Sequence, residues 1–230
     1  MRAILLSGGY GTRLRPLTIK VPKCLVPIKN KPLLEIWFER LAEAKIGPLL
    51  VNTHYLREEV ENFVECNTFK DGVTLVHEEI LLGTAGTLIS NLDFYGNQDG
   101  LLIHADNYCL ADFAAFQEAH LNRPPECLMT MMTFRTDSPT SCGIVELNEH
   151  GIVVGFHEKT PNPPGNLANG AIYILSTELL DMLRKKLFLA KDFSTEIIPR
   201  LLGRIFSYEI NELLMDIGSI DSYNRANECR

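Results

Sequence analysis

A glycine-rich loop near the N-terminus is the first stretch whose residue types could do chemistry. From residue 7 it reads Ser-Gly-Gly-Tyr-Gly-Thr-Arg-Leu-Arg, directly after the short apolar run of residues 3–6. Glycine has no Cβ, so the backbone amides of such a loop can approach a ligand closely. The charged residues that precede Glu35 in this stretch are all basic, namely Arg13, Arg15, Lys20, Lys23, Lys29 and Lys31. Because backbone N–H groups and arginine side chains match phosphate oxygens, the pattern predicts a site for a small polyanion such as phosphate.

The loop does not fit either of the two most familiar phosphate-binding motifs. A P-loop requires Gly-x-x-x-x-Gly-Lys-Ser/Thr, which the stretch does not contain. A dinucleotide loop requires Gly-x-Gly-x-x-Gly, but Leu14 stands three positions after Gly11. We therefore predict a third type of phosphate loop. The alternative is a tight strand-to-helix turn beside a solvated basic face.

Two acidic residues each follow an apolar run. Asp106 comes soon after residues 101–104, and Asp216 ends the run of residues 213–215. In open α/β sheets, ligands gather at the carboxyl ends of strands, and carboxylate oxygens suit Mg²⁺ bound to nucleotide phosphates. The two acids could therefore share a metal site, although the sequence alone cannot bring them together. For Asp106 the alternative is the N-cap of a helix, a position that aspartate favours.

A third polar cluster consists of Glu158-Lys159 and Asn169-Gly170, on either side of a turn-forming segment at residues 161–165. A glutamate can accept hydrogen bonds from sugar hydroxyls, and the adjacent lysine can donate to a phosphate. The alternative is an ordinary surface turn. The six histidines show no metal-binding spacing and no Gly-x-Ser-x-Gly motif is present, which argues against a zinc or serine hydrolase.

The composition is that of an ordinary globular protein, with 46% hydrophobic residues, 22% charged residues and a formal net charge of −7. The acidic balance, without a dense basic cluster beyond the N-terminal stretch, argues against nucleic acid as a partner. We expect no membrane association, because no apolar run approaches about 18 residues and no cleavable signal is recognisable. The six cysteines are scattered, so we predict free thiols and a cytoplasmic location.

The elements that must position these residues follow from the apolar pattern. In the first half we expect strands at residues 3–6, 49–52, 73–77 and 101–104, and helices at 31–44, 56–64 and 112–120. Residues 81–88 are expected to turn into a further helix that ends near residue 92. In the second half we expect strands at residues 128–134, 143–147, 152–157, 171–175 and 205–208, and helices at 178–186 and 195–202. Alternating strands and helices are typical of a largely parallel sheet flanked by helices. We predict one Rossmann-like α/β domain over residues 1–230, with a strand-rich lobe and halves at about 1–110 and 111–230.

These motifs together resemble the sugar-phosphate nucleotidyltransferases, also called nucleotide-sugar pyrophosphorylases. The resemblance is carried by residues 8–18, Pro22-Lys23, residues 30–32, residues 82–86, Asp106, Glu158-Lys159, residues 169–173 and residues 216–218. It covers nearly the whole chain and is closest to the GDP-mannose pyrophosphorylase and manno-heptose 1-phosphate guanylyltransferase branch. It implies attack of a sugar 1-phosphate oxygen on the α-phosphorus of a nucleoside triphosphate, with release of pyrophosphate and with Mg²⁺ as cofactor. The product would be a nucleotide sugar for glycan or cell-surface polysaccharide synthesis.

The resemblance also implies roles for individual residues. The implied catalytic residues are Arg13, Lys23 and Asp106. The implied nucleotide-binding residues are Leu6, Ser7, Gly8, Gly9, Gly11, Thr12, Arg13, Gly83, Thr84 and Asp106. The implied sugar-phosphate-binding residues are Lys23, Gly143, Glu158, Lys159, Asn169 and Asp216. The implied metal ligands are Asp106 and Asp216.

The implied substrates are GTP and mannose or manno-heptose 1-phosphate, on the appearance of Tyr10, Arg15 and residues 83–86. Uridylyl-, thymidylyl- and cytidylyltransferases remain alternatives, as does a catalytically silent subunit that senses a nucleotide sugar. The chain departs from the family pattern at Cys24, where proline is common, and at His104-Ala105 before the acid. We expect no C-terminal left-handed β-helix, so an oligomer such as a homodimer would have to use other surfaces.

Overall fold

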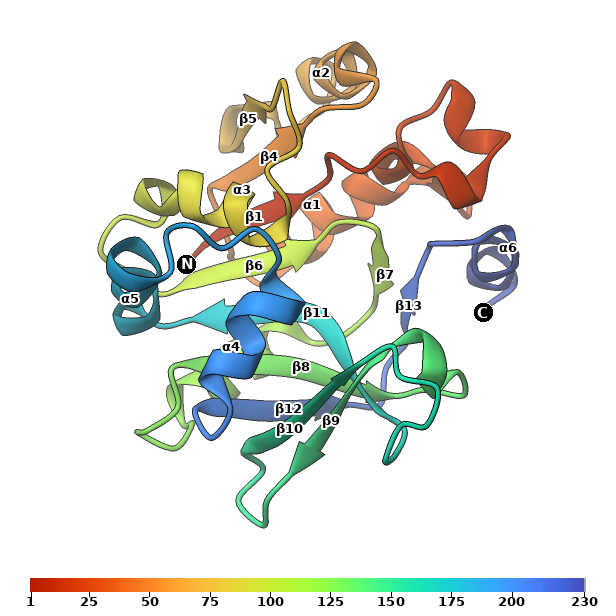
Figure 1. Cartoon of the computed structure of the whole chain (residues 1–230). Helices are drawn as coiled ribbons and strands as arrows, with labels where there is room; N and C mark the ends of the chain where they lie inside the picture. The colour runs from red at the N-terminus through yellow and green to blue at the C-terminus, as the bar shows by residue number, and fades with distance from the viewer. Residues whose placement is uncertain (230) are drawn as a thin grey trace. The chain divides into compact units, whose positions relative to one another are not determined.

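The computed structural model, drawn in Figure 1, describes residues 1–229. The chain forms two compact units. The first unit comprises Met1–Leu81, Ile103–Leu110 and Glu212–Arg230. The second comprises Leu82–Leu102 and Ala111–Asn211. The C-terminal segment therefore belongs to the same unit as the N-terminal glycine loop. A single domain with halves at about 1–110 and 111–230 stays a prediction.

The first unit is built on three parallel strands, β1 (Arg2–Leu6), β4 (Leu49–Thr53) and β5 (Val73–His77), in the order β1-β4-β5. All five residues of β4 are buried, as expected for a central strand that is covered on both faces. The end of β6 (Gly100–His104) lies beside β1, where the amide of Ala105 donates to the carbonyl of Leu6 over 3.0 Å. The carboxyl ends of β1, β4 and β6 therefore lie near one another within this unit.

Two helices belong to the same unit, α1 (Leu33–Glu43) and α2 (Arg57–Glu65). The buried residues of α1 are Leu33, Leu34, Trp37, Phe38 and Leu41. Their spacing of three and four residues places them along one face of the helix, which is the pattern that predicted it. The helix begins two residues later than expected, because Pro32 keeps an extended backbone (ψ 135°) and forms β3 (Lys31–Pro32), which pairs with β2 (Pro27–Ile28).

A second pair of strands in the first unit joins segments about a hundred residues apart. Here β7 (Asn107–Cys109) and β13 (Leu214–Asp216) run antiparallel, with Asp216 opposite Asn107. Helix α6 (Ile220–Glu228) follows, and Ser219 caps it by accepting a hydrogen bond from the amide of Ser222. None of these three elements was predicted. Each strand has only three residues, which is too short to show an alternating pattern.

The second unit is richer in strands. Its strands β8 (Met129–Arg135), β9 (Gly143–Leu147), β10 (Val153–Glu158), β11 (Leu167–Leu175) and β12 (Ile205–Ile210) pair in the order β10-β9-β11-β8-β12, and only β8 and β12 are parallel. Its helices are α3 (Thr84–Ser90), α4 (Phe113–Leu121) and α5 (Thr177–Lys186). The predicted α/β class, with a largely parallel mixed sheet, flanking helices and a strand-rich part, is confirmed.

Two segments of the second unit differ from the prediction. Strand β11 begins at Leu167 and not at Ala171, because its pairing with β8 contains an irregularity that hides the alternation. Residues 195–202 do not form an α-helix: a π-helical turn at Phe193–Ile197 continues as a 3-10 turn at Ile198–Leu201. Pro199 has no N–H, so the hydrogen bond that an α-helix requires from this position cannot form.

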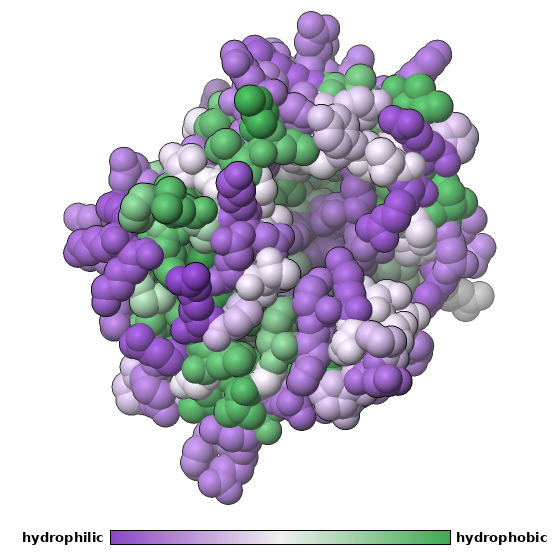
Figure 2. Space-filling model, in the orientation of Figure 1, coloured by the Kyte–Doolittle hydropathy of each residue, from purple (hydrophilic) through white to green (hydrophobic). Residues whose placement is uncertain are grey.

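The surface agrees with the composition. Figure 2 shows hydrophilic side chains over much of the visible face, with apolar groups between them. All six cysteines are free thiols, as predicted. Within residues 1–229, the longest apolar helices fall short of the length and hydropathy that crossing a membrane requires.

A buried histidine in the second unit leads to the first testable prediction. The His120 side chain is fully buried; its Nδ1 lies 2.8 Å from Thr130 Oγ1 and its Nε2 lies 3.3 Å from Asp99 Oδ2. Burial lowers the pKa of His120 below its ordinary value, and the hydrogen bond with His120 lowers the pKa of Asp99. The pKa of His120 is thus lower in the folded chain than in the unfolded chain. At a pH between these two values the unfolded chain binds more protons, so folding stability must fall as the pH drops below about 6.5.

We therefore expect the free energy of unfolding to decrease from pH 7.5 to pH 5.5, and to decrease less steeply in His120→Gln. The variant should also lose about 1–3 kcal/mol at pH 7.5, because it disturbs a buried hydrogen-bonded pair. Urea titrations followed by far-UV circular dichroism at three pH values measure both effects. An exposed-site variant, His150→Gln, should keep the wild-type slope. An unchanged slope in His120→Gln would contradict the assignment.

Candidate functional site

The glycine loop follows β1 directly and is held at both ends within the first unit. At its start, the Ser7 amide donates to Asn52 Oδ1 over 2.7 Å, and the Ser7 hydroxyl donates to the Asn52 carbonyl. At its end, Gly11 adopts a left-handed conformation (φ +60°). A Cβ on Gly11 would lie 3.0 Å from the Thr18 side chain and 3.1 Å from Lys23 Cβ. The loop therefore packs directly against the segment that carries Lys23.

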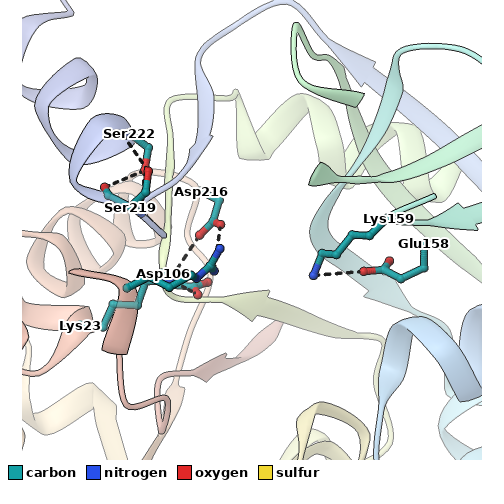
Figure 3. A network of polar contacts seen from close by, with 8 residues as sticks. Lys23, Asp106, Glu158, Lys159, Asp216, Ser219 and Ser222 are labelled. Atoms are coloured by element: carbon teal, nitrogen blue, oxygen red, sulfur yellow. Dashed lines mark hydrogen bonds and ion pairs between the residues drawn. The ribbon is translucent and has the colours of Figure 1, made fainter. Parts of the chain in front are cut away.

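Lys23 joins the two acids that the sequence singled out (Figure 3). Its Nζ lies 2.5 Å from Asp106 Oδ2 and 3.3 Å from Asp216 Oδ1. The Lys23 side chain is 10% exposed, whereas those of Asp106 and Asp216 are 37% and 55% exposed. The ammonium group thus lies beneath two carboxylates that are open to solvent. This three-residue group is called the acid–lysine cluster below.

The pairing of β7 with β13 brings the two acids together. Asp106 lies in the turn between β6 and β7, and Asp216 is the last residue of β13. The amide of Ile217 donates to the carbonyl of Asp106 over 2.9 Å, which joins the two segments beside the acids. The alternative reading of Asp106 as a helix N-cap is wrong. Asp112 has that role, since it accepts hydrogen bonds from the amides of Ala114 and Ala115 at the start of α4.

The charges of the acid–lysine cluster stabilise one another. Burial alone lowers the pKa of Lys23, but the negative charges of Asp106 and Asp216 raise it by more, so that it lies above its ordinary value. Burial raises the pKa of Asp106, but the charge and hydrogen bond of Lys23, together with the smaller effects of His104 and of a backbone hydrogen bond, outweigh burial and hold the pKa below its usual range. Lys23 is therefore an ammonium and Asp106 a carboxylate at neutral pH. A cluster that contains both an ammonium group and carboxylates can bind a ligand that contains both positive and negative charges.

Arg13 adds a second cation to this part of the unit. It lies in the 3-10 turn Thr12–Leu14, and its Nη2 is 3.9 Å from Asp216 Oδ2. The Arg13 side chain is 74% exposed, so this ion pair contributes little to stability. The guanidinium is therefore available to a ligand, which is consistent with the polyanion site that the sequence predicted.

Gly218 leaves the space in which this pair lies. A Cβ at this position would collide with Asp216 Oδ2 and lie 2.9 Å from Arg13 Nη2. The glycine therefore allows the carboxylate to lie against the backbone two residues further along the chain.

Gly218→Ala should displace the Asp216 carboxylate or the Arg13 guanidinium, which are the exposed ends of flexible side chains, and so lower the free energy of unfolding by only about 0.5–1 kcal/mol. Gly72→Ala is the matched control, because a Cβ at Gly72 would meet no atom within 4 Å. Denaturant titrations of both variants give the comparison. Equal stability of the two variants would show that the space beside Asp216 is not needed.

The second unit holds the Glu158-Lys159 pair. Glu158 ends β10, and Lys159 follows with a left-handed backbone (φ +47°); Lys159 Nζ lies 3.3 Å from Glu158 Oε1 (Figure 3). Gly143 lies opposite Glu158 on β9, and a Cβ there would lie 2.7 Å from Glu158 Oε2. Gly143 therefore provides the space for the Glu158 carboxylate.

Asn169 lies inside β11, at the point where the pairing with β8 is irregular, and not before the strand as the sequence suggested. Its Oδ1 accepts from the amide of Ala171 over 2.9 Å, and its Nδ2 donates to Tyr173 Oη over 2.7 Å. Ala171 has a left-handed backbone (φ +53°), and the ring of buried Tyr173 lies 4.7 Å from that of Phe193. Burial raises the pKa of Tyr173, so its hydroxyl stays protonated. The Asn169 amide is thus held in one orientation.

Gly83 and Thr84 begin α3 and contact the segment at residues 191–193. A Cβ on Gly83 (φ +82°) would collide with the carbonyl of Lys191, which accepts from the amide of Ala85 over 3.0 Å. Thr84 Oγ1 accepts from the amide of Phe193 over 2.7 Å. The Thr84 side chain therefore supports the local backbone, in addition to any contact with a nucleotide.

The acid–lysine cluster also provides the donors that a divalent cation requires. Within residues 1–229, histidine, cysteine and acidic side chains do not gather in threes as an all-protein metal site. Asp106 and Asp216 nevertheless converge, since one oxygen of each contacts the same Lys23 Nζ. Mg²⁺ is commonly held by one or two carboxylates together with waters and substrate phosphates, so these residues fit such an ion.

Comparison with known proteins agrees with this geometry. A family model described as nucleotidyl transferase matches residues 2–229. The chain belongs to the nucleotidyl transferase family. It is 31% identical over 223 residues to the mannose-1-phosphate guanylyltransferase catalytic subunit beta of Drosophila melanogaster. This match covers 94% of the chain and 59% of the Drosophila protein. It is also 31% identical over 225 residues to the protein of the same name from Xenopus tropicalis, and that match covers 95% of the chain and 61% of the Xenopus protein.

Among solved structures, HddC from Yersinia pseudotuberculosis, complexed with GMP-PN, has a TM-score of 0.83 to this nucleotidyl transferase fold. The match covers 99% of the chain and 98% of HddC, at 23% identity, and so demonstrates the fold. The chain spans about three fifths of the length of the two curated relatives. The sequence resemblance to nucleotidyltransferases is therefore confirmed at the level of family and fold.

Sequence reasoning missed Asn52 and His54, which contact the glycine loop, and Glu78, which is hydrogen-bonded to both of them. A signal for them was present, because Asn52 and His54 stand at the end of the apolar run 49–51 and Glu78 follows the strand 73–77. Polar residues at the carboxyl ends of parallel strands are candidates for a ligand site.

Proposed function

We propose that this chain transfers a nucleotidyl group from a nucleoside triphosphate to a sugar 1-phosphate. The single observation that supports this most strongly is the convergence of Asp106 and Asp216 on Lys23, whose segment packs against the glycine loop. Membership of the nucleotidyl transferase family and the names of the curated relatives support the same reaction. The activity remains our proposal for this chain, because it spans only about three fifths of those relatives.

In the proposed reaction, an oxygen of the sugar phosphate attacks the α-phosphorus. The bond from that phosphorus to the bridging oxygen of the β-phosphate breaks, and pyrophosphate leaves with the electron pair. Both reactants are anions, so the main task of the protein is to place them and to balance their charge. Lys23 would donate to the α-phosphate and the sugar phosphate, and Arg13 would stabilise the leaving pyrophosphate. The Lys23 side chain is buried and held by the two acids, whereas the Arg13 side chain is exposed and can move to meet the ligand.

Asp106 and Asp216 would hold Mg²⁺, which when bound neutralises phosphate charge and orients the phosphate oxygens. Lys23 would keep the two carboxylates close together before the ion and the nucleotide bind. The remaining nucleotide contacts are proposed for the glycine loop and the start of α3, at Leu6, Ser7, Gly8, Gly9, Gly11, Thr12, Gly83 and Thr84.

The sugar phosphate is assigned to residues of the second unit. Glu158 would accept hydrogen bonds from ring hydroxyls, since its carboxylate is held in the space left by Gly143. Lys159, whose side chain is 66% exposed, would donate to the phosphate. Asn169 is held by Tyr173 and Ala171, so it would present a fixed amide edge to the sugar. A cytoplasmic location and a homodimer stay predictions.

Replacing Asp106 with asparagine tests the first part of the proposal. Asp106→Asn keeps the shape of the side chain but removes a charge that binds both the metal and Lys23, so pyrophosphate release should fall by at least about a hundredfold. EDTA should abolish the wild-type activity, and added Mg²⁺ should restore it. Asp137→Asn, at an exposed residue, is the control and should keep the wild-type rate. Full activity in the presence of EDTA would rule out the metal, and full activity of Asp106→Asn would rule out this site.

The choice of base is the second part of the proposal. The guanylyltransferase names of the curated relatives favour GTP. A site built to hydrogen-bond one base leaves buried polar groups unpaired when another base binds, so discrimination should be large. We expect kcat/KM for GTP to exceed those for UTP and CTP by at least about a hundredfold, roughly 2.7 kcal/mol. Pyrophosphate release from each triphosphate, with mannose or manno-heptose 1-phosphate at saturation, measures this ratio. A preference for UTP, dTTP or CTP would keep the reaction and overturn the base.

A further inference from the structure

The residues at the end of β4 contact the glycine loop at two points. Asn52 is the fourth residue of β4, and His54 follows the strand, so both side chains lie on the same side of the extended backbone. Asn52 contacts Ser7, where the loop begins, and His54 contacts Tyr10, near the end of the glycine run. The loop packs tightly here, because a Cβ on Gly8 would lie 3.0 Å from Asn52 Nδ2 and 3.4 Å from His54 Cβ.

The Asn52 side chain is oriented by its two partners. Its Oδ1 accepts from the Ser7 amide over 2.7 Å, and its Nδ2 donates to Glu78 Oε1 over 3.1 Å. A carboxylate can only accept and an amide N–H can only donate, so the opposite orientation of the Asn52 amide would break both hydrogen bonds. Asn52 is also buried, and the partners therefore hold Ser7 in a single position.

The His54 ring is oriented in the same way. Its Nδ1 lies 2.7 Å from the carbonyl of Glu78, which can only accept, so Nδ1 carries the proton. In the neutral ring Nε2 is then an acceptor, and it receives the hydrogen bond from Tyr10 Oη over 2.9 Å. The Tyr10 and His54 rings meet edge to face, with centroids 5.2 Å apart, and the centroid of the Tyr55 ring lies 5.6 Å from that of Tyr10. Tyr10 is thus held in place although its side chain is on the surface.

Both arrangements depend on Glu78, the residue that follows β5. Its carboxylate accepts from Asn52 and its carbonyl from His54, while its own amide donates to the carbonyl of Thr53 over 2.9 Å. Glu78 is 5% exposed and therefore has little freedom to move. The β4–β5 pairing is in this way connected to both ends of the Gly8-Gly9 stretch.

We propose that His54 is a positioning residue, which through its hydrogen bond with Tyr10 holds the glycine loop in its binding conformation before any ligand arrives. Glycine loses more conformational freedom on ordering than any other residue, so a loop with three glycines would be costly for a ligand to order. A loop that is ordered in advance binds its ligand more tightly. The proposal rests on the proposed function in one respect, namely that the ligand of the loop is a nucleoside triphosphate.

The variants Tyr10→Phe and His54→Phe test this. The first removes only the hydroxyl group, and the second keeps an aromatic ring but removes both nitrogens. Amide hydrogen exchange of the peptide over residues 7–13, measured without ligand, should become at least about fivefold faster in each variant, as expected for the loss of one hydrogen bond. The double variant should exchange no faster than the faster single variant, because both changes break the same Tyr10–His54 bond.

Steady-state kinetics supply a second readout. The KM for the triphosphate should rise at least about fivefold in both variants while kcat changes less than twofold, because His54 acts through the loop and not on the reacting atoms. A matched control is His150→Phe, at an exposed histidine in the second unit, which should change neither readout. Thermal unfolding of each variant confirms that the fold is retained.

Unchanged exchange over residues 7–13 in folded Tyr10→Phe and His54→Phe would overturn the proposal, as would additive effects in the double variant. Faster exchange with an unchanged KM would overturn the part that concerns ligand binding. Faster exchange in the variants of a protein that releases no pyrophosphate from any triphosphate would support the positioning role and refute the proposed function. The two proposals can therefore fail separately.

Discussion

The contact of one lysine with two carboxylates is the interaction on which the first unit depends. Lys23, Asp106 and Asp216 come from three distant parts of the chain, and each is placed by a different element. The Lys23 ammonium is nearly buried, so without its partners it would carry an uncompensated charge away from water. The carboxylates, which are more exposed, would repel each other at this separation without the lysine. The cluster is therefore stable only as a whole, and its open side is where we propose that a cation and a phosphate bind.

Several local features follow from the need to keep this cluster together. The antiparallel pairing of β7 with β13 fixes the distance between the segments that carry the acids, and the Ile217 amide joins them next to the side chains. Gly218 keeps open the space beside the Asp216 carboxylate. Gly11 allows the glycine loop to lie against Lys23. Each of these features would be unremarkable alone, and together they account for why short strands and single glycines occur where they do.

The sequence predicted most long elements of the fold, and the reasons for the misses are physical. Strands β5 and β9 occur at the expected residues, because their apolar runs end clearly at polar or glycine residues. Helix α1 was predicted from its apolar face. Strands β7 and β13 were missed because three residues show no period, and their pairing depends on a contact between segments far apart in sequence. The left-handed backbone of Ala171 at the irregularity in β11 could not be predicted, since alanine has no preference for it.

For the site, the residue types alone were enough to indicate phosphate chemistry. Few kinds of site combine a glycine-rich loop, a run of cations and acids that follow apolar runs. These features can be recognised from the order of residues along the chain. Which of these residues contact one another could not be predicted from the order of residues. The meeting of Asp106 with Asp216, the space that Gly143 leaves for Glu158 and the contacts of Asn52 and His54 with the loop depend on strand register and on the burial of particular atoms. Such contacts arise when the chain folds back on itself, so the amino-acid sequence determined which groups are available, and only the tertiary structure decided which of them act together.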